Sequence, residues 1–271
     1  MKFFKSALMM LALLGPMTTL TARADALLQA ALDGPQRSEA NRARDTARHP
    51  GATLQFFGIT AGMTVVELNP GGGWYTEILA PYLKADGHLI EALVDPDSES
   101  ENDRKTYARF QKKLTDKPDV YGQVKTAVFE PPAKLNFAPA GSVDMVLTFR
   151  NVHNWVADGD DKMQLLFKSI YNSLKPGGVF GVVEHRLPAD RVQDASASTG
   201  YVSQAYVIKM AEQAGFRLAA SSEINANPKD HADHKKGVWA LPPTFANKDE
   251  ERQMYAEIGE SDRMTLKFVK P

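Results

Sequence analysis

Strand-like and helix-like segments alternate along most of the chain, and this alternation limits the possible folds more than any other feature. Short apolar runs typical of buried strands are separated by segments with the apolar spacing of helices. The predicted strands span residues 64–68, 88–94, 124–129, 143–149, 179–183, 218–224 and 264–269, and the predicted helices span 74–83, 103–114, 161–174 and 201–214. This order is typical of a mostly parallel sheet with helices on both faces. We therefore predict an α/β fold.

Two segments lie outside this alternation. Residues 25–60 form a helical lead-in before the first strand, and residues 225–263 form a long polar connection between the last two strands. A connection of that length inside a compact domain is usually a lid or a binding loop. We treat both segments as additions to a single domain of residues 25–271, and we expect 225–263 to be a lid-like insert.

The first 24 residues have the pattern of a secretory signal peptide. Lys2 and Lys5 precede a short apolar core, and the sequence Ala-Arg-Ala that ends at Ala24 fits a cleavage site. Gly15 interrupts the apolar run well before the roughly 20 residues that a membrane span needs. An uncleaved membrane tether is the alternative. We expect cleavage after Ala24, a periplasmic location and no integral membrane segment in the mature protein.

Composition excludes several classes of function. The chain has 32 basic and 33 acidic side chains and no basic run. Nucleic-acid binding is therefore not expected, because phosphate neutralisation needs clustered Lys and Arg. The chain has no cysteine, which excludes disulfides, thiolate metal sites and a cysteine nucleophile. The sequence contains no signal for a particular oligomeric state.

A glycine-rich turn is the most informative local motif. It lies between a predicted strand and a predicted helix, and it contains Glu67, Asn69, Gly71, Gly72 and Gly73. Glycines at such a position let a ligand approach the backbone in front of a helix N-terminus. At the carboxyl edge of a parallel sheet, this is where nucleotides bind. A tight turn with a purely structural role is the alternative.

The spacing of the glycines argues against a dinucleotide site. Dinucleotide-binding turns have the pattern G-x-G-x-x-G. If that pattern starts at Gly71 and Gly73, its third glycine falls at Thr76. A nicotinamide-dependent oxidoreductase is therefore only an alternative. The chain also lacks the Gly-x-Ser-x-Gly turn of many hydrolases.

The turn resembles the first motif of the class I S-adenosylmethionine-dependent methyltransferases. That motif is an acid at the strand end followed by alternating glycines, here Glu67, Gly71 and Gly73, with Asn69 where the first glycine usually stands. Asn adopts left-handed backbone more readily than most residues, so the turn can survive this change. Gly-Ser-Val-Asp-Met-Val at 141–146 and Leu-Lys-Pro-Gly-Gly at 174–178 resemble further segments of the family.

The resemblance implies a Rossmann-like, seven-stranded, mostly parallel sheet whose last strand is reversed. It covers about three quarters of the chain, from residue 64 onward. More narrowly, the runs at 71–79, 148–155 and 259–264 resemble a subgroup of exported methyltransferases. The function implied is methyl transfer from S-adenosylmethionine to a small-molecule or envelope-associated acceptor. A non-catalytic binding protein with the same fold is the first alternative.

The family pattern implies where the cofactor lies. The backbone of residues 67–73 would surround its methionine part. An acid at the end of the second strand usually binds the ribose, but the equivalent position here is Leu93. Glu91 and Asp95 flank it on the same strand face, and we favour Asp95 because it is nearer the carboxyl edge. A solvated loop acid is the alternative for Asp95, and Glu130 is a candidate for the adenine contact.

The segment after the fourth predicted strand should open onto the acceptor pocket. It contains Arg150, Asn151, His153, Asn154 and Trp155. His153 is the candidate general base, because an imidazole titrates near neutral pH. A structural hydrogen bond is the alternative for His153, and a core position is the alternative for Trp155. Arg150 is assigned to the carboxylate of the cofactor or to an anionic acceptor.

Two other clusters of titratable residues are candidates for a role. Glu184 and His185 end the fifth predicted strand and are assigned to the acceptor pocket, with an ion pair to Arg186 as the alternative. The sequence Asp-His-Ala-Asp-His at 230–234 has metal-ligating residue types but no separate third ligand position. We predict no metal site there.

Overall fold

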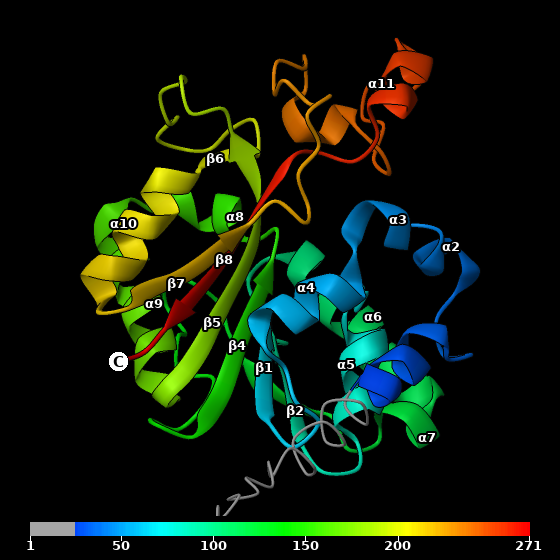
Figure 1. Cartoon of the computed structure of the whole chain (residues 1–271), viewed down its shortest axis with the longest axis vertical. Helices are drawn as coiled ribbons and strands as arrows, with labels where there is room; N and C mark the ends of the chain where they lie inside the picture. The colour runs from blue at the N-terminus through cyan, green and yellow to red at the C-terminus, as the bar shows by residue number, and fades with distance from the viewer. Residues whose placement is uncertain (1–24) are drawn as a thin grey trace, which may run out of the picture.

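The computed structural model describes residues 25–271, which form a sheet between two layers of helices (Figure 1). The strands are β1 (Thr64–Leu68), β2 (His88–Leu93), β3 (Lys125–Val128), β4 (Val143–Phe149), β5 (Leu174–Leu187), β6 (Val202–Ser203), β7 (Arg217–Ser222) and β8 (Arg263–Val269). The main order is β3-β2-β1-β4-β5-β8-β7, and β6 pairs with β5 beside this path. The predicted signal peptide, residues 1–24, lies outside the described residues.

The pairing confirms the predicted Rossmann-like topology. β1 is parallel to β2 and β4, β2 is parallel to β3, and β4 is parallel to β5. β8 is antiparallel to both β5 and β7, so the last strand is reversed as predicted. The chain leaves β1 toward one side of the sheet and returns to β4 on the other. The carboxyl ends of β1 and β4 therefore meet at a switch point, where sheets of this kind bind ligands.

Helices cover both faces of the sheet, and further helices lie in the lead-in and the insert (Figure 1). They are α2 (Glu39–Arg42), α3 (Asp45–Arg48), α4 (Pro50–Phe57), α5 (Thr76–Leu83), α6 (Glu101–Asp116), α7 (Pro118–Tyr121), α8 (Val152–Val156), α9 (Asp160–Ser173), α10 (Gln204–Ala214) and α11 (Arg252–Ile258). One apolar cluster includes residues of α9 and α10, and another includes residues of α4, α5 and α6. No helix within residues 25–271 combines the length and apolar character that a membrane crossing requires.

Most element boundaries differ from the predicted ones by a few residues, and the largest differences concern β5, the helix after β6 and the lead-in. β5 begins at Leu174, because Leu174 already pairs with Val143 on β4. The helix predicted from residue 201 begins at Gln204, because the two residues before it form β6 and the Ser203 hydroxyl caps the helix. The lead-in is broken into several short helices, of which the first spans residues 25–33.

The lead-in and the insert are joined by one carboxylate, that of Glu260. It accepts hydrogen bonds from Arg44 Nε at 2.7 Å, Arg48 Nε at 3.0 Å and Arg263 Nη1 at 3.1 Å. Burial opposes ionisation of Glu260, but Arg48, Arg263 and Arg44 outweigh it and lower its pKa to about 2. Figure 1 shows the insert, with α11, beyond the end of the sheet near α3.

Within the insert, Asp230 organises the segment that the sequence offered as a metal motif. Its carboxylate accepts hydrogen bonds from Tyr201 Oη at 2.9 Å and from the backbone of Ala232 and Asp262. His234 Nε2 lies 2.8 Å from the same carboxylate. These contacts give the motif a structural role, because they fix the insert to the β5–β6 connection.

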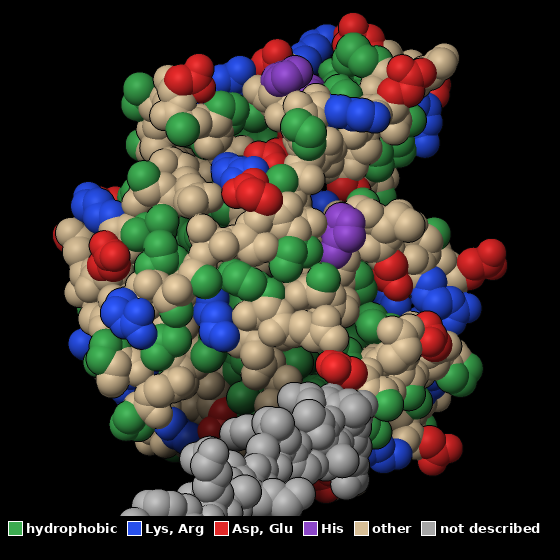
Figure 2. All heavy atoms as spheres, viewed as in Figure 1, with side chains coloured by type: hydrophobic (Ala, Val, Ile, Leu, Met, Phe, Trp, Pro, Cys, Tyr) green, Lys and Arg blue, Asp and Glu red, His purple; other side chains and the backbone are tan. Residues whose placement is uncertain are grey.

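On the face seen in Figure 2, positively and negatively charged side chains are not gathered into separate patches. Basic and acidic side chains of the described residues are interspersed over that face. The upper part of the molecule, where Figure 1 shows the insert and the β5–β6 connection, is set off from the body by an indentation. This charge distribution differs from the basic patch or stripe that a nucleic-acid-binding surface presents.

We expect Glu260→Gln to lower the free energy of unfolding by about 3–5 kcal/mol, because it leaves buried guanidinium groups without their carboxylate. Urea unfolding at pH 7 measures the loss. Since the pKa of Glu260 is lowered, its contribution is present above about pH 4.5 and is lost as the pH falls toward 2. The difference between the variant and the natural protein should therefore shrink in acid. Glu250→Gln, at an exposed ion pair in the same insert, is the control; an equal loss there would contradict the assignment.

Candidate functional site

The glycine turn directly follows β1 and has the backbone that its residues favour. Asn69, Gly71 and Gly73 have φ angles of 48°, 60° and 74°. Asn69 thus takes the left-handed conformation expected for a glycine substitute. A Cβ atom built on Gly71 would meet nothing within 4 Å, whereas one on Gly73 would meet Phe110 and Thr76 at 3.1 Å. Gly71 therefore faces open space, and Gly73 is required for packing.

Side chains from two distant elements hold this turn. Asn151, just after β4, donates from Nδ2 to the backbone oxygen of Leu68 at 3.0 Å and to that of Asn69 at 3.3 Å. Lys113 Nζ, on α6, donates to the backbone oxygens of Gly72 and Gly73, each at 3.0 Å. The carboxyl end of β4 and the α6 helix therefore fix the turn at the switch point.

A cavity of about 380 Å³ opens beside the turn. That volume lies in the range of small-molecule sites. Asn69, Gly71, Asn151 and Asn154, all assigned to the site from the sequence, line it. The buried Oδ1 atom of Asn69 has no hydrogen-bond partner among the described residues. A ligand with a hydrogen-bond donor at this point would satisfy that oxygen.

Sequence reasoning missed the wall of the cavity that α6 provides. The lining residues of this wall are Asn102, Asp103, Thr106, Tyr107 and Phe110. Ser100 fixes the start of the helix, since its hydroxyl accepts a hydrogen bond from the Asp103 backbone N–H. A capping serine followed by acids in the first turn was the available signal. It marks where α6 starts but not which side of the helix faces a ligand.

Neither of the acids that the sequence assigned to the ribose is among the residues that line the cavity. Asp95 forms an ion pair with Lys134, which also lies 3.5 Å from Glu130. Glu91 is fully buried beside Glu67. Among the described residues, the carboxylate side chain that lines the cavity is that of Asp103. Trp155 is also buried and packs edge-on against Phe129 in the core.

Glu67 and Glu91 form a buried pair of acids on adjacent strands. They are register partners of β1 and β2, and Thr76 Oγ1 donates to Glu67 at 3.2 Å. Both oxygens of Glu91 lack a hydrogen-bond partner among the described residues. Burial raises the pKa of each carboxyl, and the neighbouring Glu67 raises the pKa of Glu91 further. The pair therefore holds a proton well above the pH at which an exposed carboxyl loses it.

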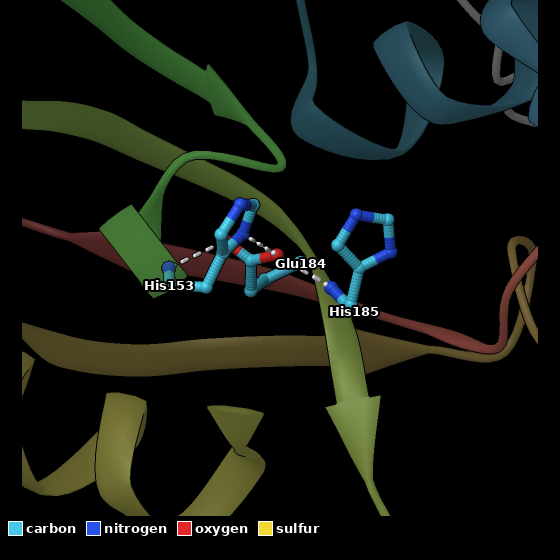
Figure 3. A group of neighbouring side chains, drawn as sticks. All are labelled: His153, Glu184 and His185. Atoms are coloured by element: carbon cyan, nitrogen blue, oxygen red, sulfur yellow. Dashed lines mark hydrogen bonds and ion pairs between the residues drawn. The ribbon is translucent and has the colours of Figure 1, made fainter. Parts of the chain in front are cut away.

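The second group of site residues lies at the ends of β4 and β5 (Figure 3). His153, on α8, turns its ring toward Glu184 on β5, with 3.0 Å between Nδ1 and Oε1. Glu184 is fully buried and also accepts from the backbone N–H of His153 and of His185. A carboxylate accepts hydrogen bonds, so this contact places a proton on Nδ1 of His153.

His185 and Arg150 complete this side of the site. His185 Nδ1 lies 2.6 Å from Ser261 Oγ. Burial, His153 and Arg150 together lower the pKa of His185 well below its ordinary value, so its ring is neutral at pH 7. Arg150 has a φ of 61° and is held by a 2.7 Å hydrogen bond from its backbone N–H to the Val183 carbonyl oxygen. The alternative partner for Glu184, Arg186, instead pairs with Glu223 and Asp262.

No protein-family model matches the chain, and no curated protein matches its sequence. Solved structures do resemble it. An S-adenosylmethionine-dependent methyltransferase from Aquifex aeolicus aligns with a TM-score of 0.56 at 14% identity, covering 91% of this chain and 98% of that one. The [4+2]-cyclase SpnF aligns with a TM-score of 0.58 at 13% identity, covering 93% of this chain and 95% of that one.

A third similar structure is named as a sarcosine dimethylglycine methyltransferase from Galdieria sulphuraria, with a TM-score of 0.54, 13% identity, and 85% and 87% coverage of the two chains. At such identities the likeness concerns the fold. A cyclase is among the matches, so the fold alone does not determine the reaction. The chain has the Rossmann-like fold found in S-adenosylmethionine-dependent methyltransferases.

The buried pair of acids, Glu67 and Glu91, predicts how the free energy of unfolding changes with pH. The folded state keeps a proton that the unfolded chain releases above about pH 4.5, so the free energy of unfolding falls as the pH rises above that value. Glu91→Gln removes this penalty and should raise the free energy of unfolding by about 1–3 kcal/mol at pH 8, with little change at pH 5. Urea unfolding at the two pH values measures it. An equal change at both values, or the same pattern in the exposed control Glu212→Gln, would contradict the assignment.

Proposed function

We propose that this protein binds S-adenosylmethionine in the 380 Å³ cavity and transfers its methyl group to a small-molecule or envelope-associated acceptor. The observation that carries the proposal is the open space in front of Gly71, at the switch point of a methyltransferase-like sheet. The cavity residues fit the cofactor: Asn69 has an unused amide oxygen for the amino group of the methionine part. The Asp103 carboxylate can accept hydrogen bonds from ribose hydroxyls.

The cofactor supplies a methyl group on a positively charged sulfur, so the protein mainly has to hold and align the acceptor. His153 is placed for one further task. Glu184 keeps the proton of the imidazole on Nδ1, and the free Nε2 can take a proton from an acceptor hydroxyl or amine. Trp239 of the insert lies edge-on to His153, with 6.0 Å between the ring centres. We infer that residues 225–263 cover the acceptor and exclude water.

We further propose that the mature protein begins at Asp25 and is exported. The support is the pattern of charge, apolar core and small residues in the first 24 positions. Residues 25–271 would then act as one catalytic domain, with the lead-in and the insert both belonging to its acceptor side.

Binding of the cofactor is the first test of this function. Calorimetric titration with S-adenosylmethionine and S-adenosylhomocysteine should show saturable one-to-one binding, and NADH should not bind. Gly71→Val should abolish this binding, because its side chain would occupy the space in front of the turn. Gly141→Val is the matched control, since Gly141 has a φ of 64° and equally open surroundings but lies at the opposite edge of the sheet. Normal binding by a folded Gly71→Val variant would refute the placement.

The carboxylate that binds the ribose can be tested separately. We expect Asp103→Asn to weaken S-adenosylhomocysteine binding about tenfold, because it removes a charged hydrogen-bond acceptor from the cavity wall. Asp95→Asn should have a smaller effect, because Asp95 is paired with Lys134. Calorimetry on both variants measures the ratio, and thermal unfolding checks that both are folded. The reverse order would assign the ribose to Asp95.

A further inference from the structure

Four arginines gather beside the acceptor side of the site, around one carboxylate. Arg44 and Arg48 come from the lead-in, Arg150 follows β4, and Arg263 begins β8. Glu260 is the carboxylate that pairs with three of them. The nearby Asp262 is engaged by Arg186, at 2.8 Å. The cluster therefore has more positive charge than the described residues neutralise.

The unused N–H donors of the guanidinium groups show which arginines carry this excess positive charge. Arg263 uses its nitrogens on Glu260 and on the backbone oxygens of Ser261 and Ala47. The side chain of Arg48 is only 5% exposed, yet its bonds to described residues all come from Nε, leaving both terminal nitrogens unused. The guanidinium of Arg150 has neither a hydrogen bond nor an ion pair to the described residues.

Such an arrangement attracts an anion. A guanidinium stays protonated at neutral pH, and the terminal nitrogens of Arg48 and Arg150 are not among the fully buried unpartnered atoms of the described residues, so a ligand can reach them. Burial and Arg150 lower the pKa of Arg48, and burial and Arg263 lower the pKa of Arg150. Packing places the two groups on one side of the site, because Arg48 lies over Trp74, Trp74 contacts Tyr75, and Tyr75 stacks on Phe149, which precedes Arg150. A guanidinium can bind an oxyanion through two parallel hydrogen bonds, and an oxyanion bound by both groups would reduce their repulsion.

The position of the cluster separates it from the cofactor cavity. Neither Arg48 nor Arg150 is among the residues that line that cavity. Both instead act electrostatically on His185, at the end of β5. The field of the arginines also disfavours a divalent cation at His153, Glu184 and His185, whose ligand atoms lie within 4.8 Å of one another. Glu184 is in any case occupied by three hydrogen bonds.

We propose that Arg48 and Arg150 form a subsite for an oxyanion, the carboxylate or phosphate group of the acceptor. The inference rests on the proposed function, because it defines the chemical class of the molecule that is methylated. The acceptor is then an anion held by the two guanidinium groups, with its reactive hydroxyl or amine directed toward His153.

The test measures anion binding directly, with benzoate and inorganic phosphate as probes at constant ionic strength and benzamide as the uncharged match for benzoate. Each probe is titrated into the free protein, into protein saturated with S-adenosylhomocysteine, and into protein saturated with 5′-methylthioadenosine, which lacks the carboxylate of the methionine part. The variants are Arg48→Gln and Arg150→Gln. Arg217→Gln, at an exposed arginine on β7, is the matched control.

We expect an anion to bind one-to-one in all three states, at least about tenfold more weakly in either cluster variant and unchanged in the control. Arg48→Lys and Arg150→Lys, which keep the charge, should recover part of the affinity. Phosphate should also raise the melting temperature of the natural protein and not that of Arg150→Gln, which checks the site even if one variant folds poorly.

Equal anion affinity in the cluster variants and the control would overturn the subsite. Loss of anion binding with S-adenosylhomocysteine but not with 5′-methylthioadenosine would assign the cluster to the cofactor's carboxylate and overturn the acceptor proposal. If neither nucleoside binds, the proposed function fails, and the titration of the free protein still decides whether the oxyanion site exists.

Discussion

The site depends on the placement of β1 beside β4, where the chain reverses its direction across the sheet. Both strands end at the same edge, and the helices that follow them depart to opposite faces. The gap between those helices can be occupied by a ligand. The side-chain amide of Asn151, which follows β4, spans this gap. It donates hydrogen bonds to the backbone oxygens of Leu68 and Asn69 at the end of β1. The glycine turn, His153 and Arg150 all take their positions from this one junction.

Ionisable groups are buried on both sides of that junction, acids on one side and arginines on the other. Toward β2, Glu67 and Glu91 place two acids side by side. Toward β8, several arginines share a single carboxylate, that of Glu260. Neither arrangement favours the folded state by itself, and strain of this kind concentrates where a protein binds or reacts. The acids lie at the strand that leads into the glycine turn, and the arginines lie on the side of the proposed oxyanion subsite.

Features with a local cause could be predicted from the sequence, whereas features that need distant partners could not. The period of apolar residues placed β1 and β4, and the conformational tolerance of Asn69 indicated a left-handed turn. The cavity wall on α6 was missed because periodicity shows which side of a helix is apolar but not what faces its polar side. The pairing of Arg44 with Glu260 spans 216 residues, and no local pattern indicates such a contact.

That separation also has a consequence for the order in which the molecule is built. A ribosome releases the chain from its N-terminus, so the lead-in emerges long before its carboxylate partner exists. The side chains of Arg44 and Arg48 therefore stay solvated until Glu260 has been synthesised. The parallel strands β1 to β5 precede Glu260 and can pair in the meantime, whereas β7 needs β8, which follows Glu260. A chain that ends before Glu260 would lack the carboxylate that joins the lead-in to the insert, and it would also lack β8.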